Sequence, residues 1–206
     1  MTDHMDFYFD FSSPYGYFAS TKIEALAAEF NRKVKWKPIL LGPMFKAAGS
    51  APLTEVPLKG DYSRHDFQRT ADLFDIPYQQ PDPFPIGTVH AARALLYMLQ
   101  IDERLAVKFA HRTFRAYFVE QKNIGEAGIV LELAEQTGID TAELAAGMVR
   151  EDIKALLKAE VDAAMARGVF GSPFIFVDDE PFWGFDRFDY IRKWLRKTAK
   201  LSDQPS

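Results

Sequence analysis

Three short motifs place side chains that can do chemistry next to residues that restrict the backbone. They are Ser12-Ser13-Pro14, Ser172-Pro173 and Asp186-Arg187. A serine directly before a proline is well suited to cap a helix that begins at the proline. A hydroxyl group at the positive end of a helix also favours a thiolate over a thiol when a sulfur atom is placed beside it. The first motif is therefore either a cap or a sulfur-binding group.

The sequence contains no cysteine. This excludes protein thiol chemistry, disulfides and thiolate metal ligands. The four histidines, His4, His65, His90 and His111, show no spacing typical of a metal site, so no metal is expected. Any sulfur chemistry in this protein must therefore arrive on a ligand.

The composition favours a globular protein with a substantial core. The chain has 206 residues, of which 48% are hydrophobic and 14% aromatic, and its net charge is −4. Such a mild charge argues against electrostatic capture of nucleic acid. The longest apolar runs fall short of a membrane span, and the first residues lack the pattern of a secretory signal. We expect a cytoplasmic protein with no nucleic-acid or membrane partner.

The pattern of elements along the chain predicts an α/β fold. A strand at 6–11 leads into a helix from Pro14 to about Phe30, and a second strand follows at 34–40. Strand character returns only at 174–177. The segment 181–183 is expected to form a hairpin with it, and Asp186 can cap a final helix. The segment 42–58, rich in proline, glycine and small residues, is expected to be a loop with a short helical turn. The remaining segments between the strands are helical or loop-like. The helices are expected at 62–74, 89–99, 103–118, 128–135, 141–150 and 151–167.

The order β-α-β, helices, then β-β-α is that of a thioredoxin-like core with a large all-helical insertion. We therefore predict a thioredoxin-like domain made of residues 1–41 and 169–206. The helical insertion domain is predicted to comprise residues 42–168. In this arrangement Ser13 follows the first strand, where thioredoxin-like redox proteins place their attacking cysteine.

Two terminal motifs give the chain a family resemblance. DFYFDFSSPYGYFA near the start and GVFGSPFIFVDDEPFWGFDRFDYI near the end resemble the 2-hydroxychromene-2-carboxylate isomerase family. The intermediate stretches LKGDYSRHDFQRTADLFDIPY and HRTFRAYFVEQKNI also fit. That family belongs to the DsbA-like branch of the thioredoxin superfamily and is close to the kappa-class glutathione transferases. The resemblance therefore implies glutathione as the cofactor.

The resemblance also implies roles for the first two motifs. Ser13 is the expected catalytic residue, and it would hydrogen-bond the glutathione sulfur. We choose Ser13 over Ser12 because it directly precedes Pro14. The Ser172-Pro173 bond is expected to be cis, so that the Ser172 backbone pairs with the cysteinyl part of glutathione like an added strand. The identity of the Ser172 side chain is expected to matter little.

The ends of glutathione are assigned to charged residues. Asp186 and Arg187 would bind the γ-glutamyl end, although by themselves they read as a helix cap and a solvated residue. Lys59 is expected to reach the glycine carboxylate. Tyr62 and Arg64 are nearby alternative candidates for this contact.

The function implied is that of a glutathione-dependent isomerase. Its substrate would be an unsaturated aromatic-derived carboxylate, similar to 2-hydroxychromene-2-carboxylate, and Arg93 or Arg112 would hold the carboxylate. The mechanism would be reversible thiolate addition, bond rotation and elimination. One alternative is a kappa-type glutathione transferase or peroxidase, and another is a non-catalytic binding protein on the same scaffold. A homodimer is expected by analogy.

Overall fold

A computed structural model describes residues 2–202 of the chain. Its centre is a four-stranded sheet with the strand order β2-β1-β3-β4. Strand β1 (His4–Phe9) pairs in parallel with β2 (Lys33–Pro38) and antiparallel with β3 (Phe174–Val177). Strand β4 (Glu180–Trp183) completes the sheet as the antiparallel partner of β3. Strands from the N-terminal and C-terminal parts of the chain thus pair in one sheet, as the sequence predicts.

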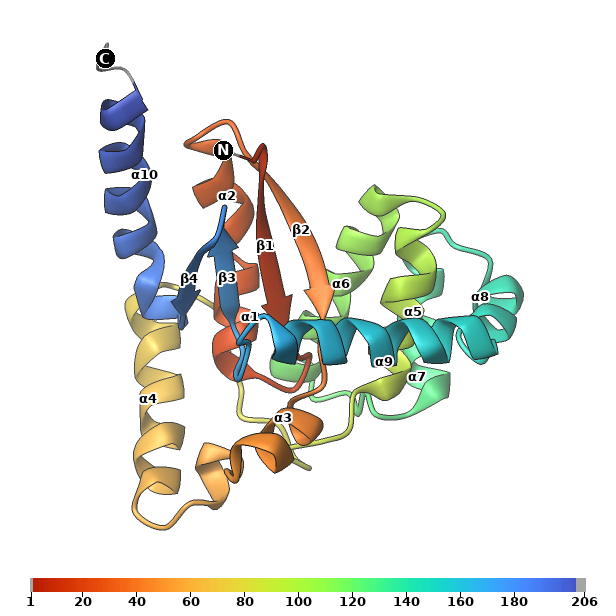
Figure 1. Cartoon of the computed structure of the whole chain (residues 1–206). Helices are drawn as coiled ribbons and strands as arrows, with labels where there is room; N and C mark the ends of the chain where they lie inside the picture. The colour runs from red at the N-terminus through yellow and green to blue at the C-terminus, as the bar shows by residue number, and fades with distance from the viewer. Residues whose placement is uncertain (1, 203–206) are drawn as a thin grey trace.

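Helices surround this sheet. They are α1 (Pro14–Ser20), α2 (Ile23–Ala28), α3 (Leu41–Ala48), α4 (Lys59–Leu73), α5 (Val89–Leu99), α6 (Glu103–Phe118), α7 (Ala127–Glu135), α8 (Thr141–Gly147), α9 (Glu151–Ala166) and α10 (Phe188–Ser202). Figure 1 shows α4 and α10 on the side of β4, whereas α5 to α8 lie on the side of β2. Two 3₁₀ turns, η1 (Leu53–Glu55) and η2 (Phe185–Arg187), complete the described elements.

The predicted thioredoxin-like order of elements is confirmed, but two local predictions need correction. The single helix expected from Pro14 to Phe30 is two helices, α1 and α2. The hydroxyl groups of Ser20 and Thr21 donate to the carbonyls of Tyr17 and Phe18, at 2.6 and 2.7 Å, and such bonds compete with the helical pattern. The segment 42–58, expected to be a loop with one helical turn, contains most of α3 and the turn η1.

The division into a thioredoxin-like domain and an insertion domain stays a prediction. Residue 1 and residues 203–206 of the predicted first domain lie outside the described residues. All four strands fall within its predicted ranges, and helices α4 to α9 fall within 42–168.

Aromatic packing fixes the helices against the start of α1. The Phe114 ring on α6 is fully buried, with its centroid 5.4 Å from that of Phe9 and 5.0 Å from that of Phe11. It also lies 6.0 Å from the ring of Tyr17 on α1. Tilted ring pairs at these distances add to the stabilisation from burial. The segment around Ser13 is therefore held by a rigid aromatic core.

An ion pair ties the turn between β3 and β4 to the start of β2. Asp178, with a positive φ of 57°, accepts hydrogen bonds from the guanidinium of Arg32 at 3.1 and 3.0 Å. These bonds are the main reason that the pKa of Asp178 is lowered to about 2, against the opposing effect of its partial burial. A carboxylate whose pKa is lowered on folding stabilises the folded state at pH values above its ordinary pKa.

We predict that Asp178→Asn lowers the free energy of unfolding at pH 7 by about 1 kcal/mol, because Asp178 is partly exposed and its pair is partly screened. The difference should shrink as the pH falls from about 4 to about 2, where the wild-type carboxylate becomes protonated. Asparagine tolerates the positive φ, so the backbone should be unchanged. Urea denaturation at several pH values measures this effect. The exposed neighbour Asp179, changed to Asn, is the control, and an equal loss at pH 2 would contradict the prediction.

Candidate functional site

Ser13 caps helix α1 and connects it to a distant part of the chain. Its side-chain oxygen accepts the Gly16 N–H at 3.0 Å, and its hydroxyl donates to the carbonyl of Ser172 at 2.9 Å. Pro14 is the first residue of the helix, and Ser13 itself is buried. The serine and its acceptor are 159 residues apart in the sequence. The fold thus brings the first two sequence motifs together.

The Ser172-Pro173 peptide bond is cis, as predicted. The Ser172 side chain has a role that the sequence reasoning missed, because its oxygen accepts the backbone N–H of Asp10 at 3.1 Å. This bond fixes the end of β1 to the segment that leads into β3. A Cβ atom on Gly16 would lie 2.8 Å from the Ser172 oxygen, so α1 and this segment are in close contact.

A cavity of about 530 Å³ lies beside this contact and is named the charged cavity here. It contains four of the five residues predicted to bind the cofactor, namely Ser172, Pro173, Asp186 and Arg187. The rest of its lining consists of Tyr15, Tyr62, Asp66, Arg69, Thr70, Leu73, Phe74, Trp183, Gly184 and Phe185. Its size lies within the range of about 300–1,000 Å³ that is typical of small-molecule sites.

Asp186 and Arg187 form an ion pair at 3.3 Å in the turn η2. The Arg187 guanidinium also lies 4.9 Å from the centroid of the Tyr190 ring. Asp186 is not the cap of α10, as the sequence analysis expected, because it lies within η2 and α10 begins at Phe188. The tight turn requires Gly184, whose φ is 113° and whose Cβ would lie 2.4 Å from an Asp186 oxygen.

Helix α4 supplies the opposite wall of the charged cavity with a polar network. The Tyr15 hydroxyl donates to Asp66, which also pairs with Arg69. Arg69 donates in turn to the Tyr62 hydroxyl at 3.0 Å. Burial, and secondarily the bond to Asp66, raises the pKa of the Tyr15 hydroxyl, which therefore stays protonated and acts as a donor.

Of this network, the sequence analysis named only Tyr62, as an alternative candidate. The spacing of 62, 66, 69 and 73 along a helix was the available signal, since residues three and four apart share one face. Lys59 begins α4 near the same face but is exposed and is not part of the cavity lining. Arg64 instead contacts the Thr54 carbonyl and Asp61. The role of Lys59 stays a prediction.

Two adjoining cavities lie on the other side of Ser13. The small apolar cavity, about 90 Å³, is lined by Ser12, Ser13, Pro14, Tyr15, Leu41, Phe45, Pro52, Leu53, Thr54, Phe67, Phe84 and Pro85. The large apolar cavity, about 260 Å³, is lined by Asp10, Ser12, Leu40, Leu41, Gly42, Pro43, Phe45, Pro52, Pro85, Ile86, Gly87, Thr88 and Val89. They share several residues and so form one groove. Tyr15 borders both the charged cavity and the small apolar cavity.

Asp10 is a buried carboxylate at the base of this groove. Its oxygens accept hydrogen bonds from Ser12 N–H (2.9 Å), Ser12 O–H (3.0 Å), Thr88 O–H (2.8 Å) and Leu41 N–H (2.8 Å). Burial raises the pKa of Asp10, and these donors oppose the shift. A fully bonded network of this kind holds the turn between β1 and α1 in one shape.

The two arginines suggested for a substrate carboxylate do not lie in these cavities. Arg112 pairs with Glu120 at 2.7 Å and with Gln136 at 2.6 Å. Arg93 is absent from the lining of the charged cavity and of both apolar cavities. The described lining of the apolar groove contains no lysine, arginine or histidine.

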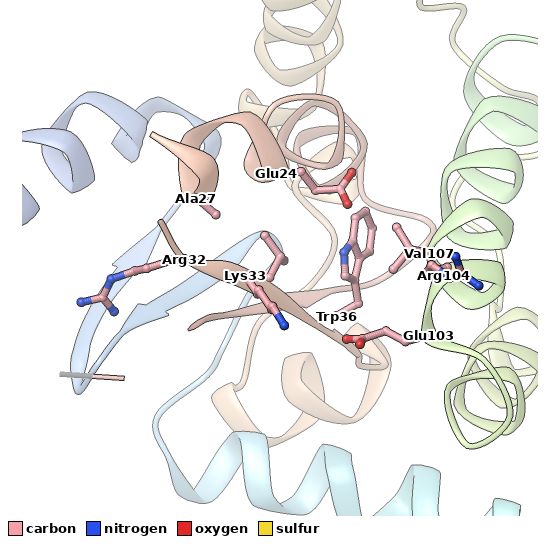
Figure 2. Close-up of a pocket in the computed structure, with 9 residues that line it drawn as sticks. Glu24, Ala27, Arg32, Lys33, Trp36, Glu103, Arg104 and Val107 are labelled. Atoms are coloured by element: carbon pink, nitrogen blue, oxygen red, sulfur yellow. The ribbon is translucent and has the colours of Figure 1, made fainter. Parts of the chain in front are cut away.

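A further cavity of about 400 Å³ lies along the outer side of β2 (Figure 2). Trp36 lies between Glu24 and Glu103 in its lining (Figure 2). Two of its charged residues have partners elsewhere, since Arg32 binds Asp178 and Glu24 contacts His111 at 2.9 Å. None of the predicted site residues lines it.

Within residues 2–202, no group of three or more histidine, cysteine, aspartate or glutamate residues is placed to hold a metal ion. In the same range no helix is both long enough and apolar enough to cross a membrane.

Comparison with known proteins agrees with the fold. The model of the DSBA-like thioredoxin domain matches residues 4–196. The chain belongs to this family. It is 30% identical over 197 residues to a 2-hydroxychromene-2-carboxylate isomerase from Sphingobium xenophagum, with 95% of this chain and 99% of that protein covered. It is 26% identical to glutathione S-transferase kappa 1 from Caenorhabditis elegans, with 97% and 94% covered.

A solved 2-hydroxychromene-2-carboxylate isomerase gives the same result in three dimensions. The two structures superpose with a TM-score of 0.86 at 26% identity, over 98% of this chain and 99% of the other. The family resemblance seen in the terminal motifs is thereby confirmed, and so is the DsbA-like thioredoxin fold.

We predict that Gly16→Ala lowers the free energy of unfolding by about 1–3 kcal/mol, although alanine is the better helix former. The reason is the clash of the new methyl group with the Ser172 oxygen at 2.8 Å. Urea denaturation of Gly16→Ala, Ser172→Ala and the double variant forms a cycle. The alanine at 16 should cost less when residue 172 has no hydroxyl. Equal costs in the two backgrounds would contradict this account.

Proposed function

We propose that the protein is a glutathione-dependent isomerase of unsaturated, aromatic-derived compounds, of the class that includes 2-hydroxychromene-2-carboxylate. The observation that supports this most is the position of Ser13. Its hydroxyl is bonded to Ser172, which lines the charged cavity, while Ser13 itself lines the small apolar cavity. One hydroxyl therefore lies where a polar ligand and an apolar ligand would meet.

The charged cavity has the groups that glutathione requires. The Asp186 carboxylate suits the ammonium group of the γ-glutamyl residue, and the Arg187 guanidinium suits the α-carboxylate of the same residue. The backbone at Ser172 and Pro173 lies between these residues and Ser13, where it suits the cysteinyl part. The names of the relatives, isomerases and kappa-class glutathione transferases, support the same choice of cofactor.

Bound glutathione would supply a thiolate for reversible addition to an unsaturated carbon, which is the chemistry that allows isomerisation. Asp186, Arg187 and the backbone at Ser172 and Pro173 would hold it beside Ser13. Ser13 serves this chemistry by directing its hydroxyl proton to the sulfur in place of the Ser172 carbonyl. Its oxygen can keep the Gly16 N–H as a donor, so the cap on α1 is retained.

Ionisation of the sulfur alone accelerates the reaction only slightly. A thiol with a pKa of about 8.5 is only about 3% ionised at pH 7, and a shift of ~2 units makes it mostly thiolate. The same shift makes the sulfur less nucleophilic, so the net gain is about a few-fold. Most of the acceleration must come from holding the sulfur and the substrate carbon together. We assign this positioning to the apolar groove, where Phe45, Phe67 and Phe84 suit an aromatic ring.

A kappa-type glutathione transferase or peroxidase is the second candidate, because the chain is also similar to a kappa-class transferase over nearly its whole length. Product analysis separates the two functions, since an isomerase returns free glutathione. We keep the homodimer and the cytoplasmic location as further predictions.

We predict that Ser13→Gly binds glutathione at least about tenfold more weakly than wild type, and that it loses the ultraviolet thiolate band, because a hydrogen bond to a charged group is removed. Glycine is chosen because it costs a helix cap only a few tenths of a kcal/mol, whereas alanine costs about 1 kcal/mol. Calorimetry and ultraviolet difference spectra measure the two effects.

The matched control is Ser12→Ala, which removes the neighbouring buried hydroxyl. This control should keep the thiolate band. Wild-type protein that fails to bind millimolar glutathione would overturn the proposed function and leave the non-catalytic binding protein as the better interpretation.

A further inference from the structure

We propose that the apolar groove accepts ring compounds without charge, and that Asp10 makes it disfavour carboxylates of the same skeleton. This inference rests on the proposed function, because it names the substrate class of the same site. It narrows the unsaturated, aromatic-derived compounds to their uncharged members, such as ketones, aldehydes and esters. Three features support it, namely the charge of Asp10, the lack of a cation in the groove lining and the position of Ser13.

Asp10 brings a negative charge to the base of the groove. It is 4% exposed and lines the large apolar cavity. Its Oδ1 accepts the Ser12 N–H and its Oδ2 accepts the Leu41 N–H, so each oxygen faces a group that can only donate. This arrangement favours the ionised carboxylate against the effect of burial, which raises the pKa of Asp10. The donors are neutral groups, so they stabilise the charge and do not cancel it.

The Asp10 carboxylate also occupies the place where a substrate anion would otherwise be most stable. Leu41 is the first residue of α3, and Thr88, whose hydroxyl donates to Asp10 at 2.8 Å, directly precedes α5. The N-terminus of a helix carries a partial positive charge and favours an anion. Because Asp10 already lies at both helix starts, it would repel a second anion placed there.

No cation in the described lining of the groove can balance a substrate carboxylate. Lys46 and His90 directly follow lining residues in the sequence, yet neither lines the small or the large apolar cavity. Ser13, which lines the small apolar cavity, lies beside a thiolate under the proposed function, and this is a further negative charge. A carboxylate moved from water into such surroundings loses hydration and gains no ion pair, so we expect it to bind weakly.

The test compares 2-hydroxychromene-2-carboxylate with its methyl ester, which keeps the ring skeleton and lacks the charge. The kcat/KM of isomerisation is measured for both compounds at saturating glutathione and neutral pH. We expect wild type to prefer the ester by at least about tenfold, although the ester is larger. Asp10→Asn should reduce this preference, because it removes the charge and keeps the shape. Thr88→Val removes one hydrogen bond of the same network but keeps the charge, so this matched control should retain the wild-type ratio.

A second pair of variants tests the lack of a cation without altering Asp10. Leu53 lines the small apolar cavity and is 45% exposed, so a lysine at this position can keep its stem on the groove and its ammonium group in water. Leu53→Lys should shift the ratio toward the carboxylate by about tenfold, whereas the uncharged Leu53→Met should keep the wild-type ratio. Circular dichroism of each variant confirms that the comparison is made between folded proteins.

Other outcomes would overturn the inference. A wild type that uses the carboxylate as well as the ester, or better, would overturn it and would leave the proposed function standing. A ratio that stays unchanged in both Asp10→Asn and Leu53→Lys would overturn the electrostatic origin of the preference. A wild type that binds no glutathione, or that isomerises neither compound, would overturn the proposed function itself.

Discussion

The hydroxyl of Ser13 joins two segments that the chain keeps far apart. As an acceptor it caps α1 through the Gly16 N–H, and as a donor it bonds the carbonyl of Ser172. Both partners are backbone groups, so the serine fixes the position of the helix start relative to the segment that enters β3. The Ser172 hydroxyl reinforces this arrangement by accepting the N–H of Asp10 at the end of β1. These bonds hold the start of α1 against the Ser172-Pro173 side of the charged cavity.

This junction separates two environments of opposite character. On one side the charged cavity offers Asp186, Arg187, Asp66 and Arg69. On the other side the groove is lined mostly by apolar residues, and its one carboxylate, Asp10, accepts four hydrogen bonds. A ligand with charged ends and a reactive centre suits the first side, and a ring compound suits the second. Under the proposed function, this arrangement would bring together two reactants that differ greatly in polarity.

Much of the site follows from local rules that the sequence displays. Ser13 before Pro14 predicts a capped helix, and α1 begins at Pro14 as expected. The ranges of α5 and α6 agree with their hydrophobic periodicity because these helices bury one continuous face against the core. Other details depend on competing interactions that periodicity does not contain. The break between α1 and α2 comes from the hydroxyl groups of Ser20 and Thr21, and Asp186 lies in a 3₁₀ turn because Gly184 lets the chain turn tightly before it.

The sequence by itself determined the family resemblance and the motifs that carry it. The absence of cysteine, the serine before Pro14 and the terminal motifs are all local properties of the chain. Only the tertiary structure decided which charged residues share a cavity. Arg69 lines the charged cavity and Lys59 does not, although both lie near one face of α4, because the Arg69 side chain is held by Asp66 and Tyr62. Such contacts depend on side-chain direction and on distant partners such as Tyr15, which no spacing along a single helix contains.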